Sequence, residues 1–205
     1  MSTELIRIEN IIAAARAGGN VLRTYFGKVL ELTQKSTLAD VRTKADLESE
    51  AAVIALLNET FPSFNIFAEE QGEIARGSDY TFVIDPLDGT HNFVLGIPNF
   101  SVSIGLLHKD TLIAGVIYLP LLDQVYYAQK GSGALMNGQP IHVSNVTQLE
   151  QACVAHSCNY GTTHQEIAHL LNELYTRHAK RSLTNWCPTF DYCLLAIGKI
   201  DGIIN

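Results

Sequence analysis

The 205-residue chain has few of the features that mark secreted, membrane-spanning or nucleic-acid-binding proteins. Its four cysteines form no C-x-x-C pair, and a chain of this length needs no disulfide staples. No apolar run approaches the ~20 residues that a membrane helix requires. Lysine and arginine number 14 against 21 acidic residues, a net charge of −7, so nucleic acid and anionic membranes are not expected as general partners.

The N-terminal segment also lacks the order of a secretion signal. Glu4 and Glu9 stand where a basic region followed by an apolar run would be needed. We therefore expect a cytoplasmic protein with reduced, mostly buried thiols at Cys153, Cys158, Cys187 and Cys193. Hydrophobic residues make up 47% of the chain and charged residues 17%, which favours a globular fold over disorder.

Hydrophobic periodicity predicts two helices in the first third of the chain. Apolar residues at steps of three and four form one seam from Leu5 to Phe26, and Gly27 ends that helix. A loop is expected over residues 33–42. A second helix is expected from Lys44 to Thr60, before Pro62. Its predicted buried face consists of Leu47, Ala51, Ile54, Leu57 and Phe61.

Short apolar runs then predict strands, and later an alternation of strand and helix. The expected strands cover residues 65–68, 80–84, 100–107, 111–119 and 124–128. Further along we expect a strand at 152–155, a helix at 163–178, a helix at 188–198 and a strand from 200. This order predicts an α+β domain at residues 1–145, with a mostly antiparallel sheet under two helices, and an α/β domain at 146–205.

Acidic side chains stand at the ends of two consecutive predicted strands. Glu69 and Glu70 end the first, Asp85 ends the second, and Asp88 follows three residues later. Strand ends at one sheet edge converge, so these carboxylates are expected close together, which is unfavourable unless protons or cations separate them. Oxygen ligands without His or Cys suit Mg²⁺ or Mn²⁺ and argue against zinc.

The dipeptide Gly89-Thr90 adds a candidate seat for phosphate. A glycine turn that leads into a helix offers free backbone N–H groups and the positive end of the helix dipole. The net negative charge of the chain would repel phosphate, and metal ions bound beside this site would make the local charge positive. Taken singly, each segment also has a structural interpretation, a solvated turn for 85–90 and an exposed acidic pair for Glu69-Glu70.

The segment Phe82 to Phe93, FVIDPLDGTHNF, resembles the signature of the inositol monophosphatase family. Three more segments match that family in its own order: residues 40–46 (D-x-x-T-x-x-D), 67–70 (the glutamate pair) and 131–138 (G-x-G-A-x-x-N-G). The likeness spans nearly the whole chain. It implies a layered αβαβα sugar-phosphatase fold, a homodimer, and lithium-sensitive, Mg²⁺-dependent hydrolysis of a small phosphate monoester by activated water, without a phosphoenzyme.

The resemblance also implies residue roles around two Mg²⁺ ions, with a third, weaker ion near Glu69. The first ion would bind Glu69, Asp85 and the Leu87 carbonyl, and the second Asp85 and Asp88. Asp46 and Thr90 would orient the attacking water. In sum, the family implies metal ligands at Glu69, Asp85, Leu87 and Asp88, catalytic residues at Asp46, Glu69 and Thr90, and substrate contacts at Glu69, Leu87, Asp88, Gly89 and Thr90.

Asp46 has a structural interpretation as well. Thr43-x-x-Asp46 is typical of a capping box at the start of the second helix. The capping role and the water-orienting role are compatible, because both require a fixed carboxylate at that position.

Two departures from the family pattern limit what the resemblance implies. The family carries a Trp-Asp pair beyond the strand that begins near Ile200, and its aspartate is a ligand of the second metal. This chain ends at Asn205, so we expect either a fragment or a natural truncation with a large loss of rate. Many members also have Gly-Ser-Ala or Gly-Thr-Ala where this chain has residues 185–189, so Trp186 is either a core anchor or a pocket wall.

Three functional hypotheses follow. The first is hydrolysis of a small phosphorylated metabolite such as inositol monophosphate. The second is a weakly active or inactive relative that serves as a binding or regulatory partner. The third is a phosphatase of fructose bisphosphate, 3′-phosphoadenosine 5′-phosphate or histidinol phosphate.

Overall fold

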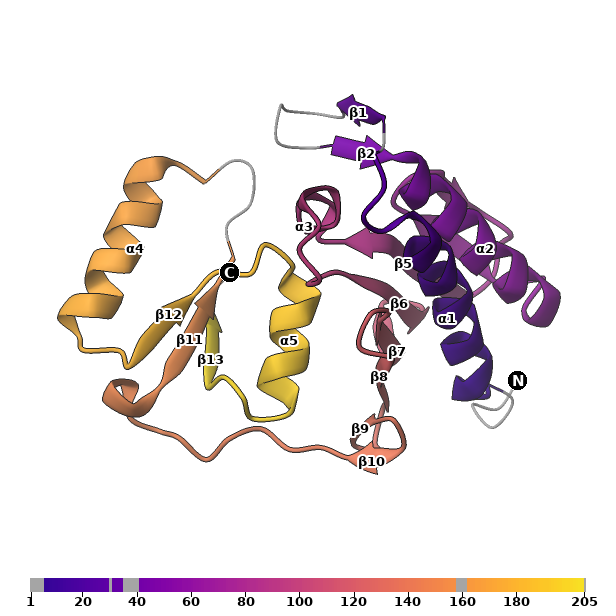
Figure 1. Cartoon of the computed structure of the whole chain (residues 1–205). Coiled ribbons are helices and arrows are strands. Elements are labelled where there is room, and N and C mark those ends of the chain that lie inside the picture. Colours follow the sequence, from indigo (N-terminus) through magenta and orange to yellow (C-terminus); the bar gives the residue numbers. More distant parts are fainter. Residues whose placement is uncertain (1–5, 30, 35–40, 158–161, 205) are drawn as a thin grey trace.

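The computed structural model describes residues 6–29, 31–34, 41–157 and 162–204. Figure 1 shows helices and sheets in alternating layers. Two N-terminal helices, α1 (Ile8–Tyr25) and α2 (Lys44–Thr60), pack side by side on an eight-stranded sheet. Helix α5 (Pro188–Ala196) separates that sheet from a three-stranded sheet, and α4 (His164–Thr176) covers the outer face of the smaller sheet. This order confirms the expected αβαβα layering.

The large sheet is antiparallel except at one pair of strands. Its order is β10-β9-β8-β7-β6-β5-β3-β4, and only β3 and β5 run parallel. The bounds are β3 Asn65–Ala68, β4 Gly72–Ile74, β5 Tyr80–Asp88, β6 Ser101–His108, β7 Thr111–Leu119, β8 Gln124–Gln129, β9 Ala134–Met136 and β10 Gln139–Pro140. The five strands predicted here are confirmed, with ends that differ by a few residues.

Alternation along β7 explains why helices cover both faces of the large sheet. Val116 and Tyr118 belong to the core beneath α1 and α2, whereas Ile117 and Leu119 pack with α5. Side chains in a strand alternate between faces, so one apolar strand serves two cores. Close contact of α1 with α2 depends on Gly18, where a Cβ atom would lie 2.7 Å from the Val53 side chain.

The small sheet is parallel throughout. Its central strand β11 (Cys153–His156) lies between β12 (Arg181–Leu183) and β13 (Gly202–Ile204). Helices α4 and α5 connect these strands in turn, as parallel pairing requires. A short 3₁₀ turn, η2 (Leu149–Gln151), precedes β11, and residues 141–148 connect the two sheets without regular structure. The division between residues 1–145 and 146–205 stays a prediction.

The bounds of α2 agree with the sequence prediction, but its predicted buried face is partly wrong. Leu47 and Ala51 are exposed, while Ser49 and Glu50 are fully buried. The polar face is buried because backbone groups of neighbouring segments bond to it: Ser49 Oγ donates to the Pro86 carbonyl at 2.9 Å. Hydrophobic periodicity cannot find such a face, because its contacts are hydrogen bonds.

The segment predicted as a loop at 33–42 is also partly wrong. Its described ends form β1 (Leu32–Gln34) and β2 (Val41–Thr43), which pair antiparallel. Asp40, part of the matched motif, and Cys158 lie outside the described residues, whereas Cys153, Cys187 and Cys193 are free thiols. No helix in the described part of the chain is long and apolar enough to cross a membrane.

Candidate active site

Parallel pairing of β3 with β5 places two of the predicted acidic residues side by side. Ala68 pairs with Ile84 in the ladder, and the Glu69 amide donates to the Ile84 carbonyl at 3.1 Å. Glu69 and Asp85 therefore follow directly after the last paired residues of neighbouring strands. Strand ends of a parallel pair meet at one sheet edge, which is the convergence that the sequence predicts.

A break in the β5–β6 ladder allows Asp88 to join them. Residues three apart in a regular strand point to opposite faces, so Asp85 and Asp88 would diverge. The register shifts between these two residues, and the Leu87 amide donates to Asp85 Oδ1 at 3.0 Å within the irregular turn. Asp85 and Asp88 thus line the same cavity.

The cavity has a volume of about 1120 Å³ and collects most of the predicted site residues. It is lined by residues of the large sheet, α3 (Thr90–Leu95), α4, α5 and the small sheet. Among them are Glu69, Asp85, Leu87, Asp88, Gly89, Thr90 and His91 from the N-terminal part of the chain. Of the predicted residues, Asp46 alone does not line it and acts on it through Thr90.

Burial and neighbouring negative charge make the ionised form of Asp85 unfavourable. Burial raises its pKa well above the usual range, and the charges of Asp88 and Glu69 and a hydrogen bond with Glu69 raise the pKa further. The hydrogen bond from the Leu87 amide opposes this effect. Negative groups forced this close would gain from a bound cation.

Asp46 divides its two oxygens between the helix cap and the cavity. Oδ2 accepts from the Thr43 amide at 2.8 Å and from the Thr43 hydroxyl at 2.7 Å, which confirms the capping box. Oδ1 accepts from Thr90 Oγ1 at 3.3 Å, and Thr90 Oγ1 also lies 3.0 Å from the Leu87 carbonyl. Burial raises the pKa of Asp46 to about 6. Capping and positioning of Thr90 therefore coexist in one carboxylate.

Gly89 has to be glycine for two reasons. Its φ of +86° is a conformation that other L-residues rarely adopt. A Cβ atom there would also lie 2.9 Å from the Asn99 carbonyl oxygen and 3.0 Å from Cys187 Cβ. The chain turns at this glycine into α3, which has only six residues.

Asp88 is held from α5, by residues that the sequence analysis did not assign. Its Oδ2 accepts from the Thr189 amide at 2.8 Å and from the Thr189 hydroxyl, and Cys187 Sγ lies 3.2 Å away. The Thr189 hydroxyl is 2.6 Å from Ser101 Oγ. Since α5 is distant in sequence, no local pattern signals this contact.

Glu50 is the second supporting residue that the sequence analysis missed. It is completely buried, and its two oxygens accept from the amides of Glu70 and Gln71 at 2.8 and 2.9 Å. These amides follow Glu69 directly, so Glu50 holds the turn that carries this acidic residue. The residues just before it, Glu48 and Ser49, are polar as well, so no local pattern marks Glu50 as a buried residue.

The chemistry of the donor set fits magnesium. Glu69, Asp85, Asp88 and Glu166 line the cavity, and none of its described lining residues is Lys or Arg. A phosphate would be repelled here unless a cation intervened. Within residues 6–29, 31–34, 41–157 and 162–204, no three Asp, Glu, His or Cys side chains form a ready-made metal-binding group. Carboxylate and carbonyl oxygens are nevertheless the ligands that Mg²⁺ prefers.

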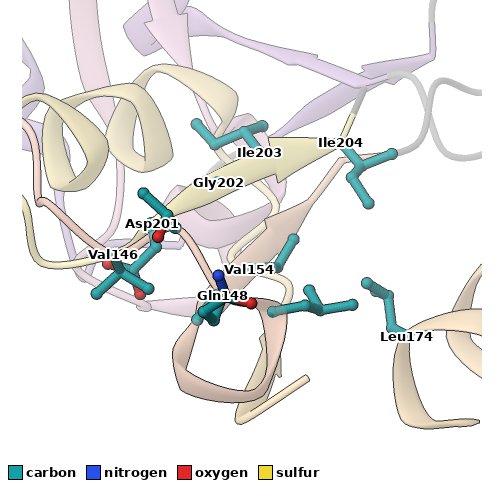
Figure 2. A pocket seen from close by; sticks show the side chains of 11 residues that line it. Val146, Gln148, Val154, Leu174, Asp201, Gly202, Ile203 and Ile204 are labelled. Carbon is teal, nitrogen blue, oxygen red and sulfur yellow. The ribbon is translucent and has the colours of Figure 1, made fainter. Parts of the chain in front are cut away.

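A second cavity, of about 320 Å³, contains none of the predicted site residues. Figure 2 shows its lining residues, which come from the 3₁₀ turn region, β11, α4 and β13. Asp201 is its only acidic residue, and this carboxylate accepts from the Cys153 amide at 2.7 Å. Its chemistry gives no reason to move the candidate site there.

The model of the inositol monophosphatase family matches residues 4–205, nearly the whole chain. The chain belongs to the inositol monophosphatase family. Its Asp85–Thr90 turn and the strand end at Glu69 lie within segments that resemble the family pattern.

Relatives within the inositol monophosphatase family carry two kinds of name. The chain is 35% identical over 197 residues to the fructose-1,6-bisphosphatase/inositol-1-monophosphatase of Aquifex aeolicus, covering 94% of this chain and 74% of that protein. It is 33% identical over 196 residues to the Nus factor SuhB of Haemophilus influenzae, covering 93% and 73%. The crystal structure of the extragenic suppressor protein suhB from Bartonella henselae superposes with a TM-score of 0.91 at 32% identity, covering 96% and 76%.

Proposed function

We propose that this inositol monophosphatase family member is a Mg²⁺-dependent phosphatase of small phosphate monoesters, with inositol monophosphate as the first substrate to test. The observation that supports it is the cavity that Glu69, Asp85 and Asp88 line together, with no lysine or arginine among its described lining residues. Divalent cations would neutralise the carboxylates of this cavity, and the bound cations would in turn attract the negative charge of a phosphate ester.

In this proposal the metal ligands are Glu69, Asp85, Asp88 and the carbonyl of Leu87. Two or three Mg²⁺ ions are expected, with Mn²⁺ as a substitute. When bound, such ions supply hydroxide at neutral pH and neutralise charge on the phosphoryl group. Glu69 counts among the catalytic residues because it lies beside Asp85, where the water would be bound.

Thr90 and Asp46 position the attacking water. The Thr90 hydroxyl donates its one hydrogen to Asp46 Oδ1 at 3.3 Å or to the Leu87 carbonyl at 3.0 Å, which leaves its oxygen lone pairs available to accept from a water in the cavity. The backbone N–H groups of Gly89 and Thr90 stand at the start of α3 and can donate to a phosphate oxygen. Asp88, tied to Thr189, lies beside that seat.

The direct test is phosphate release from inositol 1-phosphate with added Mg²⁺. The wild-type chain should release phosphate, and lithium should inhibit the release. Asp88→Asn should reduce turnover at least about 100-fold, because electrostatic groups at phosphoryl-transfer sites contribute this much or more. Asp79→Asn, an exposed carboxylate just before β5, is the matched control. A folded chain without turnover, or full turnover by Asp88→Asn, would contradict the proposal.

The same assay separates the alternative phosphatase substrates. Fructose 1,6-bisphosphate, 3′-phosphoadenosine 5′-phosphate and histidinol phosphate carry the same reacting group on different leaving groups. Because the reacting groups of the site contact only phosphate and water, they do not discriminate among these compounds. Relative values of kcat/KM on one enzyme preparation would rank them.

A binding or regulatory role is the second candidate, and the name of the Haemophilus relative favours it. Such a role would not depend on the acidic cluster. In the organism that encodes the chain, an Asp85→Asn variant without phosphatase activity should then restore the phenotype of a deletion strain. Failure of this variant, together with restoration by the Asp79→Asn control, would favour the enzymatic role.

A further inference from the structure

The large cavity has an apolar and aromatic wall that the proposed phosphate chemistry does not use. Opposite in character to the carboxylates, this wall consists of Ile167, Leu170, Trp186, Pro188 and Ile204. These side chains come from α4, α5, β13 and the loop before α5. A ligand whose phosphate lies at the carboxylates of the large sheet therefore has an apolar surface in the same cavity for the rest of its structure.

Trp186 is the unusual member of this wall. Its φ is +53°, in the left-handed region that a bulky L-residue avoids because of steric strain. Its side chain is also 60% exposed, so packing in a core does not compensate for the strain. Strained, exposed aromatic residues at a cavity wall are typical of ligand contacts. Of the two interpretations that the sequence allows for Trp186, the structure therefore favours a residue that lines the pocket over a residue that anchors the core.

Buried contacts on both sides of Trp186 hold this conformation. The Asn185 carbonyl accepts from Asn92 Nδ2 at 2.6 Å, and the Asn185 side chain donates to Asp191. Asn92 and Asp191 are both buried, and so is Cys187 on the other side of the tryptophan. The indole is thus presented to the cavity by a fixed backbone, which keeps the entropy loss on binding small.

Two polar residues that line the cavity beside this wall, Thr184 and His156, already make hydrogen bonds within the protein. The Thr184 hydroxyl donates to the His156 carbonyl at 2.9 Å, and His156 Nδ1 lies 3.2 Å from Ser182 Oγ. A hydroxyl-rich ring placed here would compete with these bonds for partners. A flat ring, in contrast, needs only the indole face and the aliphatic side chains around it.

We infer that the site prefers phosphate monoesters whose leaving group carries a flat aromatic ring system, stacked on Trp186. The inference rests on the proposed phosphatase function and names its substrate class. Nucleoside monophosphates and aryl phosphates share this chemistry, and a cavity of about 1120 Å³ is large enough for either. Stacking of a base on an aromatic side chain is expected to give roughly a five- to hundredfold preference.

The test compares four substrates and three variants. Phosphate release is measured with adenosine 5′-monophosphate, 1-naphthyl phosphate, inositol 1-phosphate and fructose 1,6-bisphosphate, all with Mg²⁺. We expect kcat/KM to be about tenfold higher for the ring-bearing pair. Trp186→Ala should remove that preference through KM, and Trp186→Phe should keep most of it. Tyr175→Ala, an exposed aromatic residue of α4 outside the cavity lining, is the matched control and should keep the preference.

Fluorescence gives a second readout that does not depend on turnover. Trp186 is the only tryptophan of the chain, so emission excited near 295 nm reports on this wall alone. In an Asp46→Asn background, where turnover is slow, adenosine 5′-monophosphate with Mg²⁺ should quench this emission. Inorganic phosphate and inositol 1-phosphate should leave it nearly unchanged.

The outcomes separate the two proposals. Hydrolysis of all four esters without a ring preference, or a preference that survives Trp186→Ala, would overturn the inference and leave the phosphatase proposal standing. A preference for adenosine 5′-monophosphate alone would identify nucleoside phosphates within the class, and a preference for both ring esters would support the class as a whole. No hydrolysis of any ester by the folded chain would overturn both proposals.

Discussion

Asp85 shows how a single residue can serve function at the expense of stability. Burial, together with the charges of Asp88 and Glu69, raises its pKa, so its ionised form is unfavourable without a cation. We predict that Asp85→Asn abolishes phosphatase activity and, in EDTA, raises the free energy of unfolding by about 1–3 kcal/mol, because it removes a buried like charge. Urea denaturation of wild type and Asp85→Asn, with and without EDTA, measures the difference in the free energy of unfolding.

The exposed Asp79→Asn substitution is the control for Asp85→Asn, and it should change neither quantity measurably. If Asp85→Asn were less stable than wild type in EDTA, the acidic cluster would not be strained in the way proposed here.

The raised pKa of Asp46 predicts that the stability of the fold depends on pH. Burial raises its pKa to about 6 from an ordinary 3.8, so the folded chain binds this proton more tightly than the unfolded chain. The corresponding stabilisation is present below about pH 4 and is lost as the pH rises through 6, by up to about 3 kcal/mol. Urea unfolding in EDTA between pH 4 and 7 should show this decline, and the difference between wild type and Asp46→Asn isolates it from other titrating groups. Equal pH slopes in the two proteins would contradict the prediction.

At the scale of single elements, α2 has a buried face built for hydrogen bonds. Ser49 and Glu50 hold the Asp85–Leu87 turn and the turn after Glu69, respectively. Two segments that carry acidic residues of the site are therefore fixed to one helix. Such support from behind keeps reacting groups within the narrow range of geometry that catalysis requires.

We predict that Glu50→Gln weakens this support. An amide side chain retains one oxygen acceptor and presents an NH₂ group to a backbone N–H, so one of the two bonds is lost. The free energy of unfolding should fall by about 1–3 kcal/mol. The Mg²⁺ concentration for half-maximal activity should rise several-fold, since Glu69 is no longer held.

The matched control for Glu50→Gln is Glu59→Gln, an exposed position near the end of the same helix. It should leave both stability and the Mg²⁺ requirement as they are in wild type. A Glu50→Gln variant with normal Mg²⁺ activation would show that the turn after Glu69 does not need this helix.

At the scale of the whole molecule, the site is a cavity that residues of both sheets line together with residues of α3, α4 and α5. Residues of the large sheet and the turn after β3 supply Asp85, Asp88 and Glu69, whereas α4, α5, β13 and the loop before α5 supply the apolar wall together with Glu166. In Figure 1, α4 and the small sheet lie on one side of α5, and the large sheet lies on its other side. A cation bound at the acidic edge would act on the native state only, because the unfolded chain does not hold these segments together.

Magnesium should therefore stabilise the whole fold. At a concentration about 100 times the dissociation constant, Mg²⁺ is expected to add about 2.7 kcal/mol to the free energy of unfolding. For a chain of this size the thermal midpoint should rise by roughly 5–10 °C. Thermal scans with increasing MgCl₂ measure this, with NaCl at equal ionic strength as the control. Asp85→Asn should show at most a small rise, and an equal rise in wild type and variant would mean that Mg²⁺ acts elsewhere.

The amino-acid sequence by itself determined the helix bounds of α2, most strands and the acidic residues at strand ends, because local periodicity, capping and turn chemistry encode these features. Tertiary structure alone decided which residues support them. Glu50, Thr189 and the wall position of Trp186 depend on contacts between segments up to 101 residues apart. Hydrogen bonds across such distances leave no periodic trace in the chain, since each partner is specified only by the packing of the layers that bring it there.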